Sequence, residues 1–308
     1  MASSAVTLSV VVTPETSLVA TPADIAAHWG IDLDARFEPL APSRALVLRS
    51  GVYVIRDAQT SVESVQWEHD LLGFLSPRIP EAVAPLQAVD GSTFLARGER
   101  VVSVTPYLAA EPANRGDSRV REEVPRLLAR LHGAAREWPD ARRRPGRQSW
   151  RELDWVANET WDWQVVERTA LLESAYDASR EWLADPPPLV ESAVHGDFHP
   201  DNLLASERGI AGVIDWEFAR IDWPASDLAA AVVVLSLQAD GAIDQRVVDE
   251  TVTAYVDAGG DDESYALEPL MRQFLLAVAL HARTRKATGL SWGPEFQAMI
   301  ETALERFV

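Results

Sequence analysis

The first half of the chain alternates short apolar runs with Gly, Pro, Ser and Asp, which is the pattern of β-strands joined by turns. Two longer segments with helical spacing interrupt the runs, at residues 21–30 and 61–75. The first has Thr21 as N-cap, Pro22 at the first helical position and Gly30 as its stop. The predicted strands are 6–12, 44–50, 52–58, 92–98 and 100–108.

Beyond about residue 110 the spacing of apolar positions becomes helical almost throughout. Pro125 and Pro269 lie inside two of these segments and predict breaks there. Strands followed by helices indicate an α+β fold with two lobes, a β-rich lobe of residues 1–107 and a mostly helical lobe of residues 108–308. The predicted helical segments are 117–138, 150–183, 224–239, 244–258, 263–287 and the stretch from Gly293.

Composition narrows the class of protein. The 308 residues contain no cysteine, so disulfides, thiolate ligands and a cysteine nucleophile are excluded. No apolar run of about 18 residues occurs and the N-terminus lacks a basic signal region, so we expect a cytoplasmic protein. The net charge of −19 argues against nucleic acid or a membrane as partner and would attract small cations.

The most polar stretch is HGDFHPDN, residues 195–202, followed by two short β-like runs around the turn residues Ser206 to Gly209. Folded as a hairpin, these runs bring Asn202 and Asp215 to the same end of the ribbon, with Asp197 in the loop before it. Carboxylate and amide oxygens suit Mg²⁺, and a carboxylate outside the metal shell can accept a proton. The spacing H-x-D-x-x-x-x-N is that of a kinase catalytic loop.

The same loop has a second interpretation, as the ligand set of a metal-dependent hydrolase. That site would use His195, His199, Asp197 and Asp201, all from one short segment. No further histidine cluster elsewhere in the sequence supports it.

The text HGDFHPDN, VIDWE and DLA, together with RLLARLHGA at residues 126–134, resembles the aminoglycoside phosphotransferase and choline kinase-like family. The resemblance extends over about residues 30–290 and implies a protein-kinase-like fold that uses ATP and Mg²⁺. It implies that Asp197 orients and deprotonates the acceptor hydroxyl, and that Asn202 and Asp215 hold the metal.

In the β-rich lobe, Arg56 ends one face of the strand VYVIRDA, where the family has a cation for the ATP phosphates. Glu68 lies on an apolar stripe of the following helix and would need a partner, for which Arg56 is the candidate; alternatively it lies at the edge of the stripe in water. The phosphate-covering loop has no glycine, and its Ser43 either contacts phosphate or forms a simple turn.

The resemblance also implies an adenine-binding junction at VVSVTPYL, with the Pro106 carbonyl and the Leu108 N–H facing the base. His195 is expected to hydrogen-bond the backbone around the loop, and His199 either contacts phosphate or braces the loop. Asp227 is expected to cap the helix from Leu228 and brace the same loop.

The acceptor is not readable from the residues. Trp155, Glu159 and Asp162 fall near one helical face and would suit an organic cation, or else belong to ordinary packing and solvated surface. The first choice is a cationic antibiotic such as an aminoglycoside or macrolide, which would make the chain a resistance enzyme; choline, an amino acid or a sugar is the alternative. A different class of answer is a nucleotide-binding protein without transferase activity, which the glycine-free loop would favour.

Overall fold

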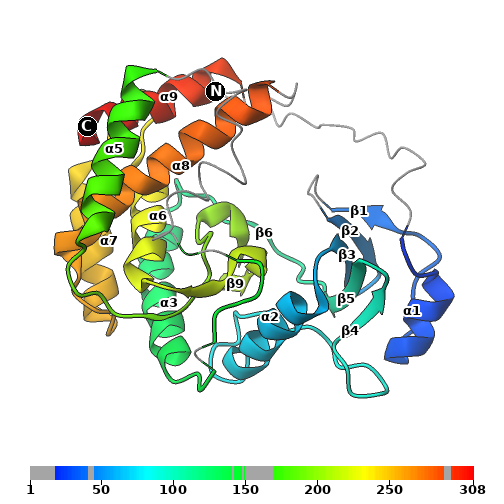
Figure 1. Cartoon of the computed structure of the whole chain (residues 1–308). Coiled ribbons are helices and arrows are strands. Elements are labelled where there is room, and N and C mark those ends of the chain that lie inside the picture. Colours follow the sequence, from blue (N-terminus) through cyan, green and yellow to red (C-terminus); the bar gives the residue numbers. More distant parts are fainter. Residues whose placement is uncertain (1–17, 41–44, 141, 148, 150–168, 288–292) are drawn as a thin grey trace. The chain divides into compact units, whose positions relative to one another are not determined.

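A computed structural model describes residues 18–40, 45–140, 142–147, 149, 169–287 and 293–308 (Figure 1). The chain divides into two compact units. The first comprises the described residues of Met1–Asp70 together with Val83–Leu108, and the second comprises Leu71–Ala82 and Ala109–Val308. The strand predicted at 6–12 lies outside the described residues.

The first unit is built on a five-stranded antiparallel sheet in the order β1-β2-β3-β5-β4. The structure confirms the four described strand predictions and both helices of this half. The sheet and helix bounds are β1 Glu38–Pro39, β2 Leu46–Ser50, β3 Tyr53–Gln59, β4 Phe94–Arg97, β5 Arg100–Pro106, α1 Pro22–Trp29 and α2 Val62–Leu75, whose last residues, from Leu71, belong to the second unit.

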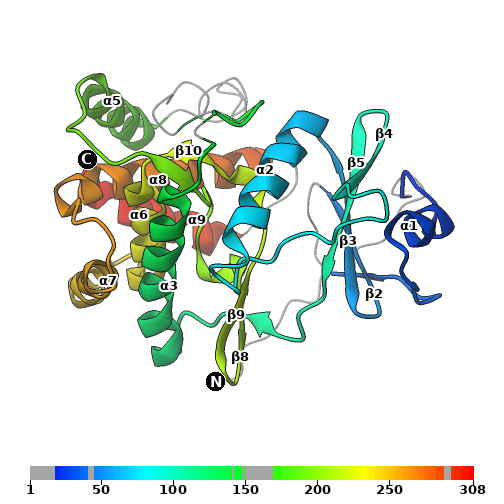
Figure 2. The same cartoon turned by 90° about the horizontal axis from the view of Figure 1, so that it is seen from below.

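Helix α1 covers one face of this sheet (Figure 2). Thr21 and Asp24 form a capping box at its start, and Gly30 ends it in the left-handed conformation. Ile25 and Trp29 pack against Ile55 of β3 and its neighbours in β5. Because side chains alternate along a strand, Arg56 lies on the opposite face of the sheet from Ile55.

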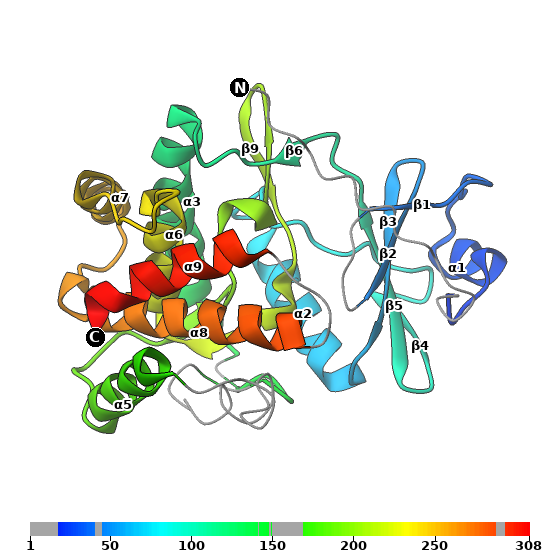
Figure 3. The ribbon, with the colours of Figure 1, turned by 90° about the horizontal axis from the view of Figure 1, so that it is seen from above.

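The second unit is mostly helical. Helix α6 is buried on nearly every side and forms its centre, with α3, α7 and α8 packed around it. Helices α8 and α9 lie side by side (Figure 3). The helices are α3 Ser118–Arg136, α5 Ala170–Ala184, α6 Pro224–Ser236, α7 Gln245–Asp257, α8 Leu267–Ala287 and α9 Pro294–Leu304.

The predicted breaks at Pro125 and Pro269 are wrong, since α3 and α8 run through both prolines. Pro269 stands in the first turn of α8, where a missing N–H costs nothing. Pro125 lies in the interior of α3 and is buried together with Val124 and Leu128. The packing of this apolar face outweighs the one hydrogen bond that the proline removes.

Two small sheets in this unit pin the polar loop. Strand β7 (Ser192–Val194) pairs with β10 (Arg220–Asp222), and β8 (Leu203–Ser206) pairs with β9 (Gly209–Val213). β6 (Glu111–Pro112) adds a third strand beside β8. The loop 195–202 therefore connects β7 to β8, and the segment 214–219 connects β9 to β10. Because β7 pairs with β10 and β8 pairs with β9, the start of the loop lies beside the end of the second segment, and the end of the loop lies beside its start.

No helix among the described residues is long and apolar enough to span a membrane.

Candidate active site

The predicted hairpin is confirmed, and it places Asn202 beside Asp197. Leu203 of β8 is paired with Val213 of β9, so Asn202 and Ile214 stand at the same end of the ribbon. The Asn202 amide nitrogen donates to the Asp197 backbone oxygen and to its Oδ2, both at 2.9 Å. Two oxygen acceptors settle which end of the amide is nitrogen. In the described part of the chain, Asn202 Oδ1 takes part in no hydrogen bond, which leaves an oxygen of the type that Mg²⁺ prefers.

Asp215 is brought to the same place by the residue before it. The Ile214 N–H donates to the Asn202 carbonyl at 2.9 Å, and its carbonyl accepts from His195 Nε2 at 2.9 Å. Asp215 itself is exposed and has φ 62° and ψ 58°, the left-handed region. It is the one non-glycine residue with positive φ in the described part of the chain. Such strain is found where a side chain has a task.

The Asp197 carboxylate is half-buried, with 32% of its side chain exposed. Its Oδ1 lies 3.3 Å from His199 Nε2. Burial has the largest effect on the pKa of Asp197 and raises it, but the hydrogen bond and charge of His199 and the hydrogen bond from Asn202 outweigh burial and leave the pKa lowered. Asp197 is therefore an ionised carboxylate held by donors on both oxygens.

His199 is the partner of that carboxylate. Burial lowers its pKa, but the hydrogen bond and charge of Asp197, followed by the charges of Asp201 and Asp215, outweigh burial and raise the pKa overall. His199 thus braces the loop through Asp197, which was one of the two predicted roles; the structure does not bear on the other, contact with phosphate.

His195 hydrogen-bonds the backbone on both sides, as predicted. Its Nε2 donates to the Ile214 carbonyl, and its Nδ1 accepts from the Asp197 N–H at 3.2 Å. Burial, the largest effect, lowers the pKa of His195, so the ring is neutral as these bonds require. With both nitrogens engaged, His195 cannot ligate a metal. Among the described residues no group of three or more His, Asp or Glu side chains is arranged to hold one, which counts against the hydrolase interpretation.

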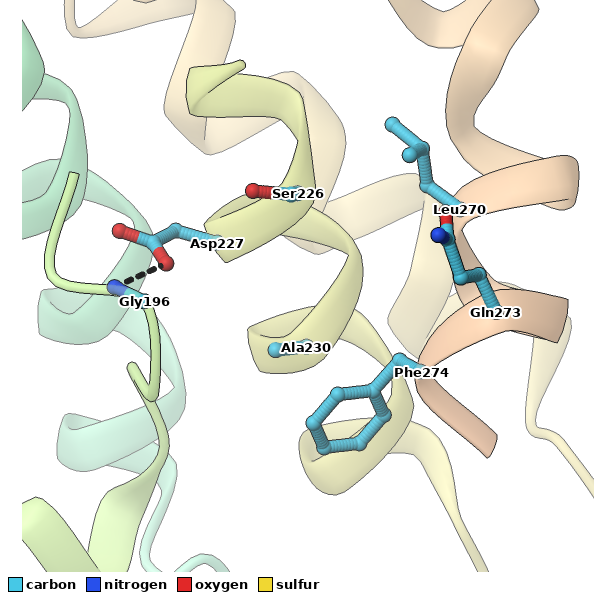
Figure 4. Close-up of a pocket in the computed structure, with 7 residues that line it drawn as sticks. All are labelled: Gly196, Ser226, Asp227, Ala230, Leu270, Gln273 and Phe274. Atoms are coloured by element: carbon cyan, nitrogen blue, oxygen red, sulfur yellow. Dashed lines mark hydrogen bonds between the residues drawn. The ribbon is translucent and has the colours of Figure 1, made fainter. Parts of the chain in front are cut away.

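Asp227 fixes the loop from the helical core (Figure 4). Its Oδ1 accepts from the Gly196 N–H at 2.9 Å and its Oδ2 from the His195 N–H at 2.8 Å. The predicted bracing role is confirmed, but the predicted capping role is wrong. Helix α6 begins at Pro224 with Trp223 as N-cap, so Asp227 is already one turn inside and its carboxylate is available to the loop.

A narrow pocket lies beside this contact, between α6 and α8 (Figure 4). It is lined by Gly196, Ser226, Asp227, Ala230, Leu270, Gln273 and Phe274.

The first unit holds the residues predicted to contact the nucleotide. Arg56 is half-buried on β3, and Glu68 is 8% exposed on α2, so the alternative in which Glu68 lies in water is wrong. At the end of β5, the Tyr107 N–H is used by the Val52 carbonyl at 2.8 Å. Within the described residues the Leu108 N–H makes no hydrogen bond, which leaves it open to a ligand. Ser43, Trp155, Glu159 and Asp162 lie outside the described residues.

Two arginines that the sequence did not single out also belong to the site's surroundings. Arg144 and Arg220 are both 3% exposed and donate to backbone carbonyls in the turn after Asp215. A run of arginines such as residues 142–144 reads as exposed surface, so the sequence carried no signal for the first of them.

The two-unit architecture, the loop H-x-D-x-x-x-x-N and the hairpin that leads to Asp215 together define a kinase-like phosphotransferase. A family model described as "Phosphotransferase enzyme family" (APH) matches residues 42–267. The chain belongs to this family and is a small-molecule phosphotransferase, which favours the enzyme over a nucleotide binder without activity. The resemblance inferred from the motifs is confirmed.

Individual relatives are more distant. A homoserine kinase from Bradyrhizobium sp. (strain BTAi1 / ATCC BAA-1182) is 25% identical over 234 residues, which cover 75% of this chain and 68% of that protein. Among solved structures, an amicoumacin kinase in complex with AMP-PNP, Ca²⁺ and Ami has a TM-score of 0.75 at 13% identity, with 92% of each chain covered. A microcompartment-associated aminopropanol kinase has a TM-score of 0.71 at 20% identity, covering 92% of this chain and 96% of that one. These likenesses confirm the kinase-like α+β fold.

Proposed function

We propose that the chain transfers the γ-phosphoryl group of ATP, in the presence of Mg²⁺, to a hydroxyl of a small amine-bearing molecule. The observation that carries this proposal is the Asn202 amide: its nitrogen holds the Asp197 carboxylate at 2.9 Å, and its oxygen points elsewhere. Asn202 would thus hold the proton acceptor, Asp197, with its nitrogen and bind the metal with its oxygen, and phosphoryl transfer needs both roles.

In this proposal Asp197 orients the acceptor hydroxyl and takes its proton. The hydroxyl oxygen forms a bond to the γ-phosphorus while the bond from that phosphorus to the β–γ bridging oxygen breaks, and ADP leaves with the electron pair. A strong base is not required, because most of the catalysis is positioning and charge neutralisation. A carboxylate held ionised by His199 and Asn202 is suited to that task.

Asn202 and Asp215 would hold the divalent ion, which would neutralise charge on the phosphates. The exposed Asp215 carboxylate and the open oxygen of Asn202 fit a hard cation. The remaining ligands would come from phosphate oxygens and water, so a cluster of three protein carboxylates is not needed.

We assign nucleotide binding to a lobe of residues 1–107 and catalysis and acceptor binding to residues 108–308. Arg56 would contact the phosphates and pair with Glu68. The adenine would accept from the Leu108 N–H and donate to the Pro106 carbonyl. This register is supported by the Tyr107 N–H, which already donates to the Val52 carbonyl. Ser43 would contact phosphate, and Trp155, Glu159 and Asp162 would line the acceptor site.

The acceptor class rests on charge and on the similar proteins. Homoserine and aminopropanol, which name two of those proteins, each combine a hydroxyl with an amine. A net charge of −19 favours such cations near the protein. Amino acids and amino alcohols are therefore proposed beside hydroxylated antibiotics, which the amicoumacin kinase represents.

The test is the Asp197→Asn variant in an ATP-consumption assay over hydroxylated amines. We expect kcat with the true acceptor to fall about 10²- to 10⁴-fold, because the proton acceptor is lost, while the affinity for ATP is unchanged. Asp201→Asn is the matched control. That carboxylate belongs to the same loop, but its side chain is 86% exposed and, at 3.9 Å from His199, lies beyond hydrogen-bond distance. Full turnover by Asp197→Asn would show that this assignment is wrong.

A further inference from the structure

The turn that follows Asp215 is held by a buried arginine. The turn is the 3₁₀ segment Trp216–Phe218, which begins at Asp215 and ends at Ala219. Arg144 is 3% exposed, and its Nη1 donates to the Trp216 carbonyl at 2.9 Å and to the Ala219 carbonyl at 3.1 Å. The Trp216 carbonyl also accepts from the Ala219 N–H at 3.0 Å. A single nitrogen of Arg144 thus joins both ends of the turn.

A second buried arginine holds the residue between. Arg220 Nη1 donates to the Phe218 carbonyl at 2.8 Å, and its Nε donates to Asp222 Oδ2 at 2.8 Å. The same Nη1 stands where a side chain on Gly196 would begin. Arg220 therefore contacts both the turn and the loop that carries Asp197.

Burying these two guanidinium groups costs free energy, so their presence calls for an explanation. Taking a guanidinium out of water costs several kcal/mol before its hydrogen bonds are counted. Carbonyls at the end of a turn can be solvated by water instead. A left-handed Asp215 costs a further ~1–2 kcal/mol and persists only where the surroundings enforce it. Arg144 provides that enforcement at the four residues directly after Asp215.

We propose that Arg144 is a positioning residue: by holding the turn 216–219 it keeps Asp215 in the left-handed conformation that binds the divalent ion. This inference rests on the proposed assignment of Asp215 to the metal. The planar guanidinium, with donors in a fixed geometry, is required for the task, and lysine, a flexible point donor, does not replace it.

The experiment measures metal affinity rather than turnover. Mn²⁺ is titrated, with detection by electron paramagnetic resonance, into protein saturated with a non-hydrolysable ATP analogue. For Arg144→Met we expect Mn²⁺ to bind about tenfold more weakly, because removing a group that orients a metal ligand typically costs 10- to 100-fold. Metal-free binding of the analogue is unchanged. Amide hydrogen exchange at residues 214–219 becomes faster.

Two further variants keep the test decisive. Arg142→Met is the matched control, since Arg142 is an exposed arginine two positions earlier whose Nε donates to Asp140 Oδ1 at 2.8 Å; it leaves Mn²⁺ affinity unchanged. Should Arg144→Met fold poorly, Arg144→Ala is measured with and without millimolar methylguanidinium, which restores Mn²⁺ affinity if the guanidinium acts on the turn. Arg144→Lys is expected to bind Mn²⁺ as weakly as Arg144→Met, because lysine does not supply the planar guanidinium.

The outcomes separate this inference from the proposed function. If Asp215→Asn leaves Mn²⁺ affinity unchanged, the metal assignment itself is wrong. If Asp215→Asn weakens Mn²⁺ binding but a folded Arg144→Met does not, only the role of Arg144 is overturned. If Asp215→Asn and Arg144→Met both bind Mn²⁺ weakly, and methylguanidinium restores the affinity of Arg144→Ala, the metal assignment and the role of Arg144 are both supported.

Discussion

At the scale of single residues, the loop that carries Asp197 depends on a glycine. Gly196 has φ +83°, and a Cβ on it would overlap the Phe218 carbonyl oxygen and Arg220 Nη1. The close approach of loop and turn is therefore possible only because position 196 has no side chain.

The variant Gly196→Ala tests this dependence. We expect a loss of roughly 3 kcal/mol or more in the free energy of unfolding, since backbone strain and a clash with buried groups add. Gly259→Ala is the matched control: its φ is +94°, and nothing lies within 4 Å of its Cβ, so only the backbone strain of ~1–2 kcal/mol remains. Urea unfolding gives both values. Equal losses would show that the loop yields to a methyl group.

At the scale of elements, helix α6 anchors the loop through one carboxylate. Asp227 accepts two backbone N–H groups, and His132 Nε2 of α3 lies 3.5 Å from its Oδ2. His132 Nδ1 in turn lies 2.8 Å from the Tyr255 hydroxyl of α7. Three helices thus meet at the base of the loop through buried hydrogen bonds, so the core holds the loop in addition to the hydrogen bonds within it.

Replacing Asp227 by Asn leaves one of two buried N–H groups without an acceptor. We expect a loss of about 2 kcal/mol in the free energy of unfolding and a lower kcat, because the loop is no longer fixed.

The pH dependence of that loss has a definite sign. Burial, the largest effect, raises the pKa of Asp227, but the hydrogen bond and charge of His132 and the charge of Arg220 outweigh burial and lower the pKa. The stabilisation by this carboxylate is therefore present above its unfolded pKa of about 3.9 and is lost as the pH falls through the lowered folded pKa. The difference between wild type and Asp227→Asn should stay constant from about pH 5 to about pH 8 and shrink below about pH 4. A difference that grows on acidification would contradict the assignment.

At the scale of the whole molecule, the relevant feature is the net charge of −19. The acidic side chains repel one another in the folded state, and salt screens that repulsion.

We therefore expect Tm to rise between low and physiological salt, by roughly 2–4 °C for each ~1 kcal/mol of repulsion removed. Tetramethylammonium chloride should act like sodium chloride, because screening does not depend on the identity of the cation. A Tm that is flat or falling in both salts would mean that the acidic groups are already compensated by local partners.

The sequence was informative where neighbours in the chain are also neighbours in space. The spacing of Asp197 and Asn202, and the short hairpin to Asp215, predict the centre of the site because few residues separate them. The contact of Arg144 with the turn was not predictable, since its carbonyl partners lie more than seventy positions away. The capping role assigned to Asp227 was wrong because Pro224 starts the helix earlier than the polar pattern indicates.

The link between Asp215 and the loop has a consequence for how this site tolerates change. Ile214 is bonded through its own N–H and C=O, to Asn202 on one side and His195 on the other. These groups are the same in nineteen of the twenty amino acids, and proline alone lacks the N–H. The identity of the side chain at position 214 is thus decoupled from the geometry of Asp215, the metal ligand proposed above, so another side chain can replace Ile214 while the backbone beside Asp215 keeps its hydrogen bonds.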